Sequence, residues 1–407
     1  MNTLPAFHVM TKPTGAICNL DCTYCFYLEK EKLYPGRGSY KMTDATLEAY
    51  VRQYIEGQDA AEITFAWQGG EPTLMGLEFF RRAVALQRRY CPSGKTVKNA
   101  FQTNGTLLDD AWESFLKSEG FLVGLSIDGP RELLDLYRVD KGGKPTFDSV
   151  MRGLVVLKRH GVEFNTLTVV HRENATRPLA VYRFLKEIGS GFIQFIPLVE
   201  RVGDGEALAP PPGLEGGDGG EGPAVTPWTV RPRDYGEFMT VIFDDWIRTD
   251  VGRVFVQLFD VQLGITMGLG SSLCYFAETC GLALALEHNG DLFSCDHYVY
   301  PNYRLGNVHE APLAELVNAV EQRKFGADKR DTLPAFCRRC DVVEMCRGEC
   351  PKRRFARTPD GDQGLNYLCG AYKPLFRHLR PHLETMGRLL RSGRPAADIM
   401  RLNRAPL

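Results

Sequence analysis

The chain has 407 residues, of which 44% are hydrophobic and 24% charged, and this ordinary globular composition excludes a disordered or fibrous protein. Basic residues number 49 and acidic residues 50, so the net charge of −1 argues against a protein held to nucleic acid by phosphate contacts. No apolar run reaches the roughly 18 residues of a membrane span, and residues 1–12 show no export signal, so we expect a cytoplasmic protein.

The first half of the chain alternates strand-like with helix-like segments. Short runs rich in Val, Ile and Phe predict six strands: Phe7–Lys12, Ile63–Trp67, Val97–Gln102, Leu122–Ile127, Glu163–Val170 and Phe192–Leu198. Five helices are predicted between them: Thr43–Glu56, Leu77–Tyr90, Asp109–Lys117, Phe147–His160 and Pro178–Ile188. Thr43 and Asp109 have the chemistry of helix N-caps. The alternation predicts an α/β fold with a parallel sheet whose strand C-termini carry the function.

Six strand–helix units are too few for a closed eight-fold barrel. We therefore expect a partial (β/α)6 TIM-type barrel over residues 1–230, although periodicity alone also allows a doubly wound sheet. Within it, residues 203–226 are rich in Gly and Pro and predict a flexible surface loop. We expect a linker with a helix at 231–270, a Cys-rich domain at 271–372 and a helical tail at 373–407.

Twelve cysteines form three groups with one left over. The groups are Cys18, Cys22 and Cys25; Cys274, Cys280 and Cys295; and Cys337, Cys340, Cys346, Cys350 and Cys369, whereas Cys91 stands alone. Clustered cysteines in a long cytosolic chain are metal ligands or catalysts more often than disulfides. The cysteines are therefore the most informative feature of the sequence.

The first group suits one metal centre, because three thiols lie within eight residues of the loop after the first predicted strand. A structural zinc site would need a fourth protein ligand, and none lies near in the sequence. A 4Fe–4S cluster with three thiolates leaves one iron open for a substrate or cofactor. A zinc knuckle or free thiols remain the alternative.

Cys18, Cys22 and Cys25 resemble the Cys-x3-Cys-x2-Cys signature of the radical S-adenosylmethionine (SAM) enzymes. The resemblance implies that the open iron binds SAM and that an electron passed through the cluster releases a 5′-deoxyadenosyl radical. The sequence Gln-Gly-Gly-Glu-Pro at 68–72 matches the family's Gly-Gly-Glu-Pro segment, in which Glu71 is available to an ammonium group. By resemblance, the residues that contact SAM are Tyr24, Gly69, Gly70, Glu71, Ser126, Arg138 and Val199. Asn104-Gly105 and Asp128-Gly129, at the next strand ends, belong either to this site or to ordinary turns.

The C-terminal cysteines resemble the SPASM domain, a Cys-rich extension of some radical SAM enzymes. The resemblance implies two auxiliary 4Fe–4S clusters with interleaved ligands, both of which move electrons because neither has an open iron. Cluster I would use Cys274, Cys280, Cys295 and Cys350, and cluster II would use Cys337, Cys340, Cys346 and Cys369. Zinc at any single Cys-x2-Cys remains the alternative.

Segments along nearly the whole chain, including 22–27, 68–73, 102–106, 121–130 and 294–298, are similar to the anaerobic sulfatase-maturating enzymes. These enzymes oxidise a Cys or Ser in a sulfatase's Cys/Ser-x-Pro-x-Arg motif to formylglycine (3-oxoalanine). The resemblance implies that Asp296 is the general base and that Tyr27 and Gln194 position the peptide. The implied partners are a sulfatase polypeptide and an electron donor such as flavodoxin or ferredoxin. We expect no nucleic-acid or membrane partner.

Two other functions stay open. One is a SPASM enzyme that forms thioether or carbon–carbon links in peptides, but the 17 residues before Cys18 are too few for the leader-binding module that many of these carry. The other is a non-catalytic iron–sulfur or zinc-binding interaction protein. Three cubane clusters predict about twelve irons per chain, whereas a zinc scaffold predicts almost none.

Overall fold

The computed structural model describes residues 6–34, 40–203, 208, 210–212 and 225–402. Most of the predicted loop at 203–226 lies outside these residues. The chain divides into two compact units: Met1–Ser126, Leu134–Phe164 and Cys280–Asp328 form the first, and Ile127–Leu133, Asn165–Thr279 and Lys329–Leu407 form the second. These units follow contacts in space rather than chain order, so the boundaries of the predicted domains stay predictions.

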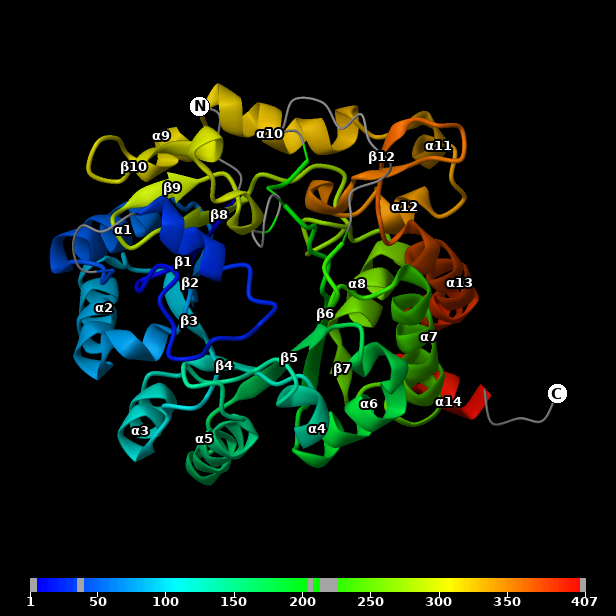
Figure 1. Ribbon diagram of the computed structural model, residues 1–407, viewed down its shortest axis with the longest axis horizontal. Helices are drawn as coiled ribbons and strands as arrows, with labels where there is room; N and C mark the ends of the chain where they lie inside the picture. Colours follow the sequence, from blue (N-terminus) through cyan, green and yellow to red (C-terminus); the bar gives the residue numbers. More distant parts are fainter. Residues whose placement is uncertain (1–5, 35–39, 204–207, 209, 213–224, 403–407) are drawn as a thin grey trace. The chain divides into compact units, whose positions relative to one another are not determined.

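A sheet forms the centre of the first unit, with the strand order β10-β9-β8-β1-β2-β3-β4 (Figure 1). Its strands are β1 His8–Thr11, β2 Glu62–Trp67, β3 Thr96–Thr103, β4 Leu122–Ser126, β8 Ala283–Leu286, β9 Asp291–Phe293 and β10 Arg304–Asn307. The strands β8, β1, β2, β3 and β4 run parallel to one another, whereas β9 pairs antiparallel with β8 and β10 pairs antiparallel with β9. Parallel strands end at the same edge of a sheet, so the loops after β1, β2 and β3 meet there.

Helices accompany these strands where the sequence predicts them. The helices of the first unit include α1 Asp44–Glu56, α2 Leu77–Tyr90, α3 Asp110–Ser118, α5 Phe147–His160 and the short α9 Leu313–Val317. The Thr43 side chain accepts a hydrogen bond from the Thr46 N–H, and the Asp109 side chain accepts from Ala111 and Trp112, which confirms both predicted caps. Each predicted strand and helix of the first half is confirmed to within one residue at either end.

The second unit has its own parallel strands: β5 Phe164–Val170, β6 Phe192–Pro197 and β7 Phe255–Val256. Its helices include α6 Pro178–Glu187, α7 Pro232–Thr249, α8 Gln257–Thr266, α11 Ala335–Arg338, α12 Val343–Cys346, α13 Cys369–Arg391 and α14 Ile399–Leu402, with a hairpin of β11 Ala356–Arg357 and β12 Gln363–Leu365. The tail helix begins at Cys369, earlier than the predicted residue 373. It ends at Arg391 because Gly393, with a φ of 75°, turns the chain away.

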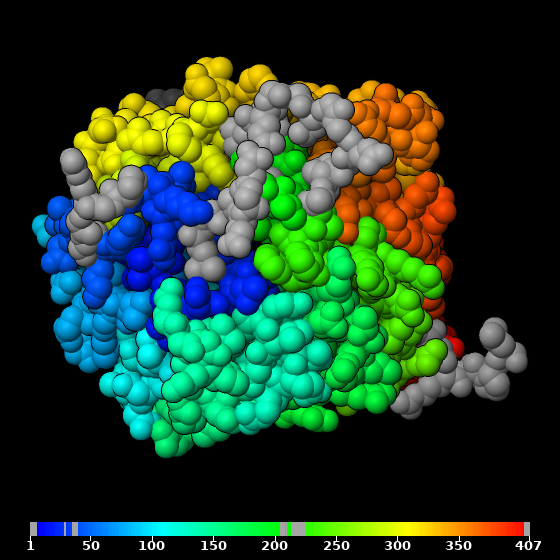
Figure 2. Space-filling view, in the orientation of Figure 1, coloured from blue at the N-terminus to red at the C-terminus, as the bar shows by residue number. Residues whose placement is uncertain are grey.

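The sequence did not predict that residues 280–328 would extend the sheet of the first unit. Strand β8 pairs in parallel with β1, with His8 opposite Ala283 and Thr11 opposite Leu286. In Figure 2 the yellow surface of this segment adjoins the blue surface of the N-terminal residues. This pairing places Cys295 and Asp296, which follow β9, beside the end of β1. Among the described helices, none has both the length and the apolar composition of a membrane span.

Candidate active site

Three thiols lie on the loop that follows β1. Cys22 is buried, and Cys18 and Cys25 are half-buried. The loop is folded back on itself, since the Cys25 N–H donates to the Cys22 carbonyl at 2.8 Å and the Leu20 N–H donates to the Cys18 sulfur at 3.3 Å. Burial, together with the nearby Glu71 and Cys22, raises the pKa of Cys18 to about 11. The loop therefore gathers sulfur ligands on one short, internally bonded segment.

Gly69 and Gly70 hold the next loop against this one. The Gly70 N–H donates to the Gly15 carbonyl and the Glu71 N–H to the Ile17 carbonyl, each at 2.9 Å. A Cβ at position 70 would lie 1.9 Å from the Ile17 carbonyl oxygen, so only glycine fits there. The close backbone approach inferred from the sequence is thus made to the cysteine loop. A contact of either glycine with SAM stays a prediction.

The Glu71 side chain is fully buried and joins the loops after β2 and β3. Its carboxylate accepts hydrogen bonds from the Thr73 N–H and hydroxyl, the Thr103 hydroxyl and the Asn104 N–H, at 2.7 to 3.0 Å. Burial raises its pKa in spite of these donors. Glu71 is thereby engaged by the protein itself, and its bond to an ammonium group stays a prediction.

Asn104, which the sequence left undecided between a functional role and a turn, contacts the cysteine loop. Its amide donates to the Asn19 side chain at 2.9 Å and to the Cys18 sulfur at 3.7 Å. The signal for it was its place at the end of a parallel strand, next to the end of β2.

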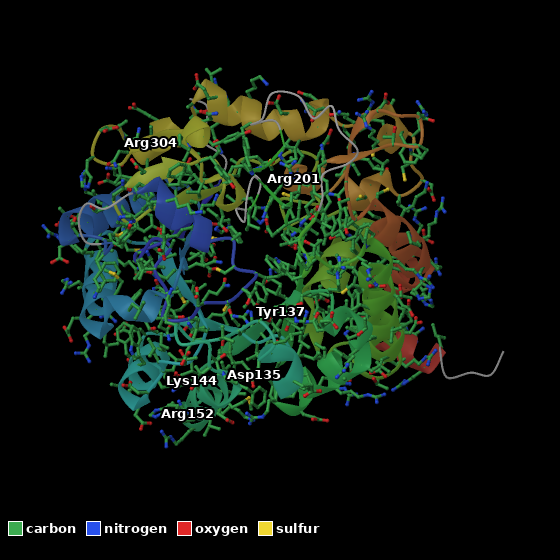
Figure 3. All side chains as sticks on the ribbon, viewed as in Figure 1. Asp135, Tyr137, Lys144, Arg152, Arg201 and Arg304 are labelled. Atoms are coloured by element: carbon green, nitrogen blue, oxygen red, sulfur yellow. The ribbon has the colours of Figure 1, made fainter. Side chains whose placement is uncertain are left out.

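Tyr24 and Arg138, two of the residues predicted to contact SAM, lie together in the first unit. The Arg138 guanidinium lies 5.7 Å from the centre of the buried Tyr24 ring. Tyr137, labelled in Figure 3, packs edge-on against the same ring at 5.9 Å. Ser126 is buried at the end of β4. Val199 and Gln194 belong to the second unit, so their places in the site stay predictions.

Asp296 is held by two side chains of the N-terminal segment. The ammonium of Lys12 lies 2.6 Å from one carboxylate oxygen of Asp296, and the Tyr27 hydroxyl donates to both oxygens at 3.0 and 2.8 Å. Lys12 is fully buried and also lies 3.5 Å from Glu287. Burial, the largest single influence, would raise the pKa of Asp296, but the Lys12 and His297 charges and the hydrogen bonds from Lys12 and Tyr27 together hold this pKa below its ordinary value. The carboxylate is therefore charged at neutral pH and able to accept a proton.

The second unit gathers most of the C-terminal cysteines. Burial raises the pKa of Cys337 to about 11 and that of Cys346 to about 12. The nearby Cys369 thiol raises both pKa values further. Cys340 in turn raises the pKa of Cys369, so all four thiols predicted for cluster II are neighbours. Burial raises the pKa of Cys350 to about 12, and Cys274 adds to the rise.

The other two thiols predicted for cluster I, Cys280 and Cys295, belong to the first unit, so the assembly of this cluster stays a prediction. Among the described residues, no three His, Cys, Asp or Glu side chains are placed to hold a single metal ion. The donor set itself fits iron–sulfur clusters, whose irons take thiolate ligands.

Comparison with known proteins agrees with these observations. Residues 13–185 match the radical SAM superfamily, and residues 274–341 match an iron–sulfur cluster-binding domain, SPASM. A serine-type anaerobic sulfatase-maturating enzyme of Bacteroides thetaiotaomicron is 45% identical over 97% of this chain and 94% of its own. The chain belongs to the anaerobic sulfatase-maturating enzymes. A cysteine-type member from Clostridium perfringens is 34% identical over 93% of this chain and 98% of its own.

Solved structures of this family have the same fold. The structure described as native anSMEcpe with bound AdoMet and Cp18Cys peptide has a TM-score of 0.81 and 33% identity, over 95% of this chain and 100% of that one. This enzyme is thus a radical SAM enzyme with a mixed α/β fold and a parallel sheet, followed by a SPASM domain.

Proposed function

We propose that this sulfatase-maturating enzyme oxidises a Cys or Ser side chain in a sulfatase's Cys/Ser-x-Pro-x-Arg motif to formylglycine. The observation that carries the proposal is the placement of Asp296, a charged carboxylate beside Cys295 with Lys12 and Tyr27 fixing both of its oxygens. Asp296 retains 16% exposure of its side chain, whereas Lys12 has none. A substrate can therefore reach the base, but water cannot reach its counter-ion.

The loop with Cys18, Cys22 and Cys25 would hold the SAM-binding cluster, and the remaining ligand cysteines would hold two auxiliary clusters. When bound, SAM and its cluster supply the one-electron chemistry that removes a hydrogen atom from Cβ of the target residue. Tyr24 and Arg138 offer an aromatic face and a cation to SAM.

The protein's own task is to remove a proton and to provide a route for an electron. After hydrogen abstraction, the target residue must lose one proton and one electron to become an aldehyde from Ser or a thioaldehyde from Cys. Asp296 accepts the proton, and the neighbouring thiolate of Cys295 would connect the site to an auxiliary cluster that takes the electron. In the Cys case water then replaces sulfur, which leaves as hydrogen sulfide.

The partners follow from the same chemistry. The protein substrate is a sulfatase polypeptide that is modified before folding or export, which places the reaction in the cytoplasm. A small electron carrier such as flavodoxin or ferredoxin would supply the reducing electron. Because the relative with 45% identity is of the serine type, we expect the enzyme to accept a Ser peptide. Comparison with a Cys peptide shows whether the enzyme accepts both residues.

The test offers the anaerobically reconstituted enzyme Ser and Cys versions of a sulfatase-motif peptide and seeks the aldehyde by mass spectrometry. Asp296→Asn should keep iron content and deoxyadenosine formation but lose about 99% of the product, as expected for removal of a general base. The matched control is Asp59→Asn, which changes an exposed carboxylate of the same unit and should behave like the parent. Normal product yield from Asp296→Asn would refute its role, and the absence of aldehyde from both peptides would refute the proposed reaction.

A further inference from the structure

A left-handed turn separates Cys346 from Cys350 in the second unit. Arg347, Gly348 and Glu349 have φ values of 47°, 69° and 49°. Among the described residues, Arg347 and Glu349 are the two non-glycine residues with positive φ. Side chains crowd the backbone in this conformation, so three successive residues hold it only where surrounding contacts stabilise it.

Arg354 supplies those contacts. Its guanidinium is buried and donates to four backbone carbonyls: Gly348 at 2.9 Å, Lys329 at 2.6 Å, Arg347 at 2.8 Å and Glu349 at 3.2 Å. All three carbonyls of the turn therefore bind one side chain. The planar guanidinium of arginine holds its N–H donors at fixed angles, whereas the ammonium of lysine carries fewer donors and no fixed plane.

The guanidinium also packs directly against the backbone of the turn. A Cβ added at Gly348 would lie 2.7 Å from an Arg354 Nη2 atom and 2.3 Å from Leu333. The fit thus requires both the arginine and the absence of a side chain at position 348.

The N–H side of the turn faces sulfur. Burial raises the pKa of Cys346, and the backbone N–H of Gly348, which hydrogen-bonds this thiol, acts against the rise. Glu349 points elsewhere, since its fully buried carboxylate accepts from Arg353 at 2.5 Å and from Asn366 at 2.8 Å. The turn therefore presents carbonyls to Arg354 and an N–H group to Cys346.

We propose that Arg354 is a positioning residue for the auxiliary clusters: it fixes the left-handed turn so that Cys346 and Cys350 are preset as ligands and the Gly348 N–H is aimed at the Cys346 sulfur. This inference rests on the proposed ligand roles of the two cysteines. Hydrogen bonds to ligand sulfur favour the reduced form of a cluster, so loss of the bond lowers its reduction potential.

The test compares two variants. Arg354→Lys keeps the positive charge but removes the planar guanidinium. Gly348→Ala keeps the guanidinium but pushes it away from the turn. Both should shift the midpoint potential of an auxiliary cluster to more negative values in a redox titration followed by electron paramagnetic resonance. The matched control is Arg357→Lys, because Arg357 is exposed and donates only to the Gly361 carbonyl among the contacts described. Potentials unchanged from the parent in both variants would overturn the proposal.

A second readout uses the metal-free chain. It separates two possible failures: that of the cluster assignment, and that of the clamp, by which we mean the hold of Arg354 on the turn at 347–349. Alkylation of Cys346, followed by peptide mass spectrometry, should be about tenfold faster in Arg354→Lys than in Arg357→Lys, because the turn opens more often. Equal rates in the two variants would overturn the clamp. If the parent binds no auxiliary iron but the alkylation rates differ as expected, the clamp stands and the ligand roles fail.

Discussion

The two units bury charge in different ways. In the first unit, Lys12 is shared between Asp296 at 2.6 Å and Glu287 at 3.5 Å, and the Asp296 side chain keeps 16% exposure. In the second, Glu349 is fully buried against Arg353, while the guanidinium of Arg354 donates its hydrogen bonds to backbone carbonyls. The first arrangement leaves a carboxylate partly exposed, whereas the second leaves its carboxylate fully buried.

The proposed function accounts for this difference between the two units. A carboxylate that exchanges protons must stay reachable, and a single buried cation keeps it charged without saturating its oxygens. Ligands of a cluster that only passes electrons gain from rigidity, because fixed sulfur positions and fixed N–H groups set its potential. Under the proposed roles, buried charge would serve chemistry in the first unit and backbone geometry in the second.

The largest effect that separates the two units comes from their cysteines. Cys22→Ser should abolish SAM cleavage, with about eight of twelve irons retained, since only the proposed SAM-binding cluster would be lost. Cys369→Ser should lose iron from cluster II and retain deoxyadenosine formation. Iron analysis and chromatography of deoxyadenosine measure both effects.

Cys91→Ser is the matched control for these two variants. Cys91 follows α2, and its thiol donates to the Lys95 carbonyl at 3.4 Å, away from the ligand groups in the sequence. This variant should retain all iron and all activity. Loss of SAM cleavage from Cys369→Ser would show that the two cysteine regions do not act separately.

A smaller but more specific effect should come from Lys12→Met. Without Lys12, burial would raise the pKa of Asp296 and the carboxyl would hold its proton, so product per deoxyadenosine should fall by about 100-fold, as for loss of a general base, while SAM cleavage continues. Lys30→Met is the control, because Lys30 is also buried in the first unit but donates to the Val299 carbonyl and lies over the Tyr300 ring. An equal fall in both variants would mean that the fold, and not the Asp296 charge, had been damaged.

The sequence predicts the strands and helices of this protein better than the contacts between its distant segments. Strands and helices of the first half follow from local patterns, and the spacing of the cysteines is enough to indicate the ligand loop. The pairing of β8 with β1, which joins Lys12 to Asp296, is a contact between distant segments that no local pattern encodes. The left-handed turn at 347–349 likewise depends on Arg354, whose role is invisible without its four carbonyl partners.

Glu113 on α3 sharpens the comparison, because it is buried in the first unit without a partner. Neither of its carboxylate oxygens has a hydrogen bond among the described residues, and burial, with Asp109 and Asp110 adding to it, raises its pKa from 4.5 to about 8. The folded state therefore holds the proton more tightly than the unfolded state does. The stability contributed by this proton is complete below the unfolded pKa and is lost as the pH rises through the folded one.

Glu113→Gln removes this pH dependence. Relative to the parent, the variant should gain about 2 kcal/mol of unfolding free energy between pH 6 and pH 8.5, measured by anaerobic urea unfolding. Glu78→Gln, which changes an exposed carboxylate on α2, should show no such gain. If Glu113→Gln shows none either, an unpaired buried carboxyl would behave like the paired ones. The buried charges of the two units would then differ only in how deeply they are buried, and not in how each is paired.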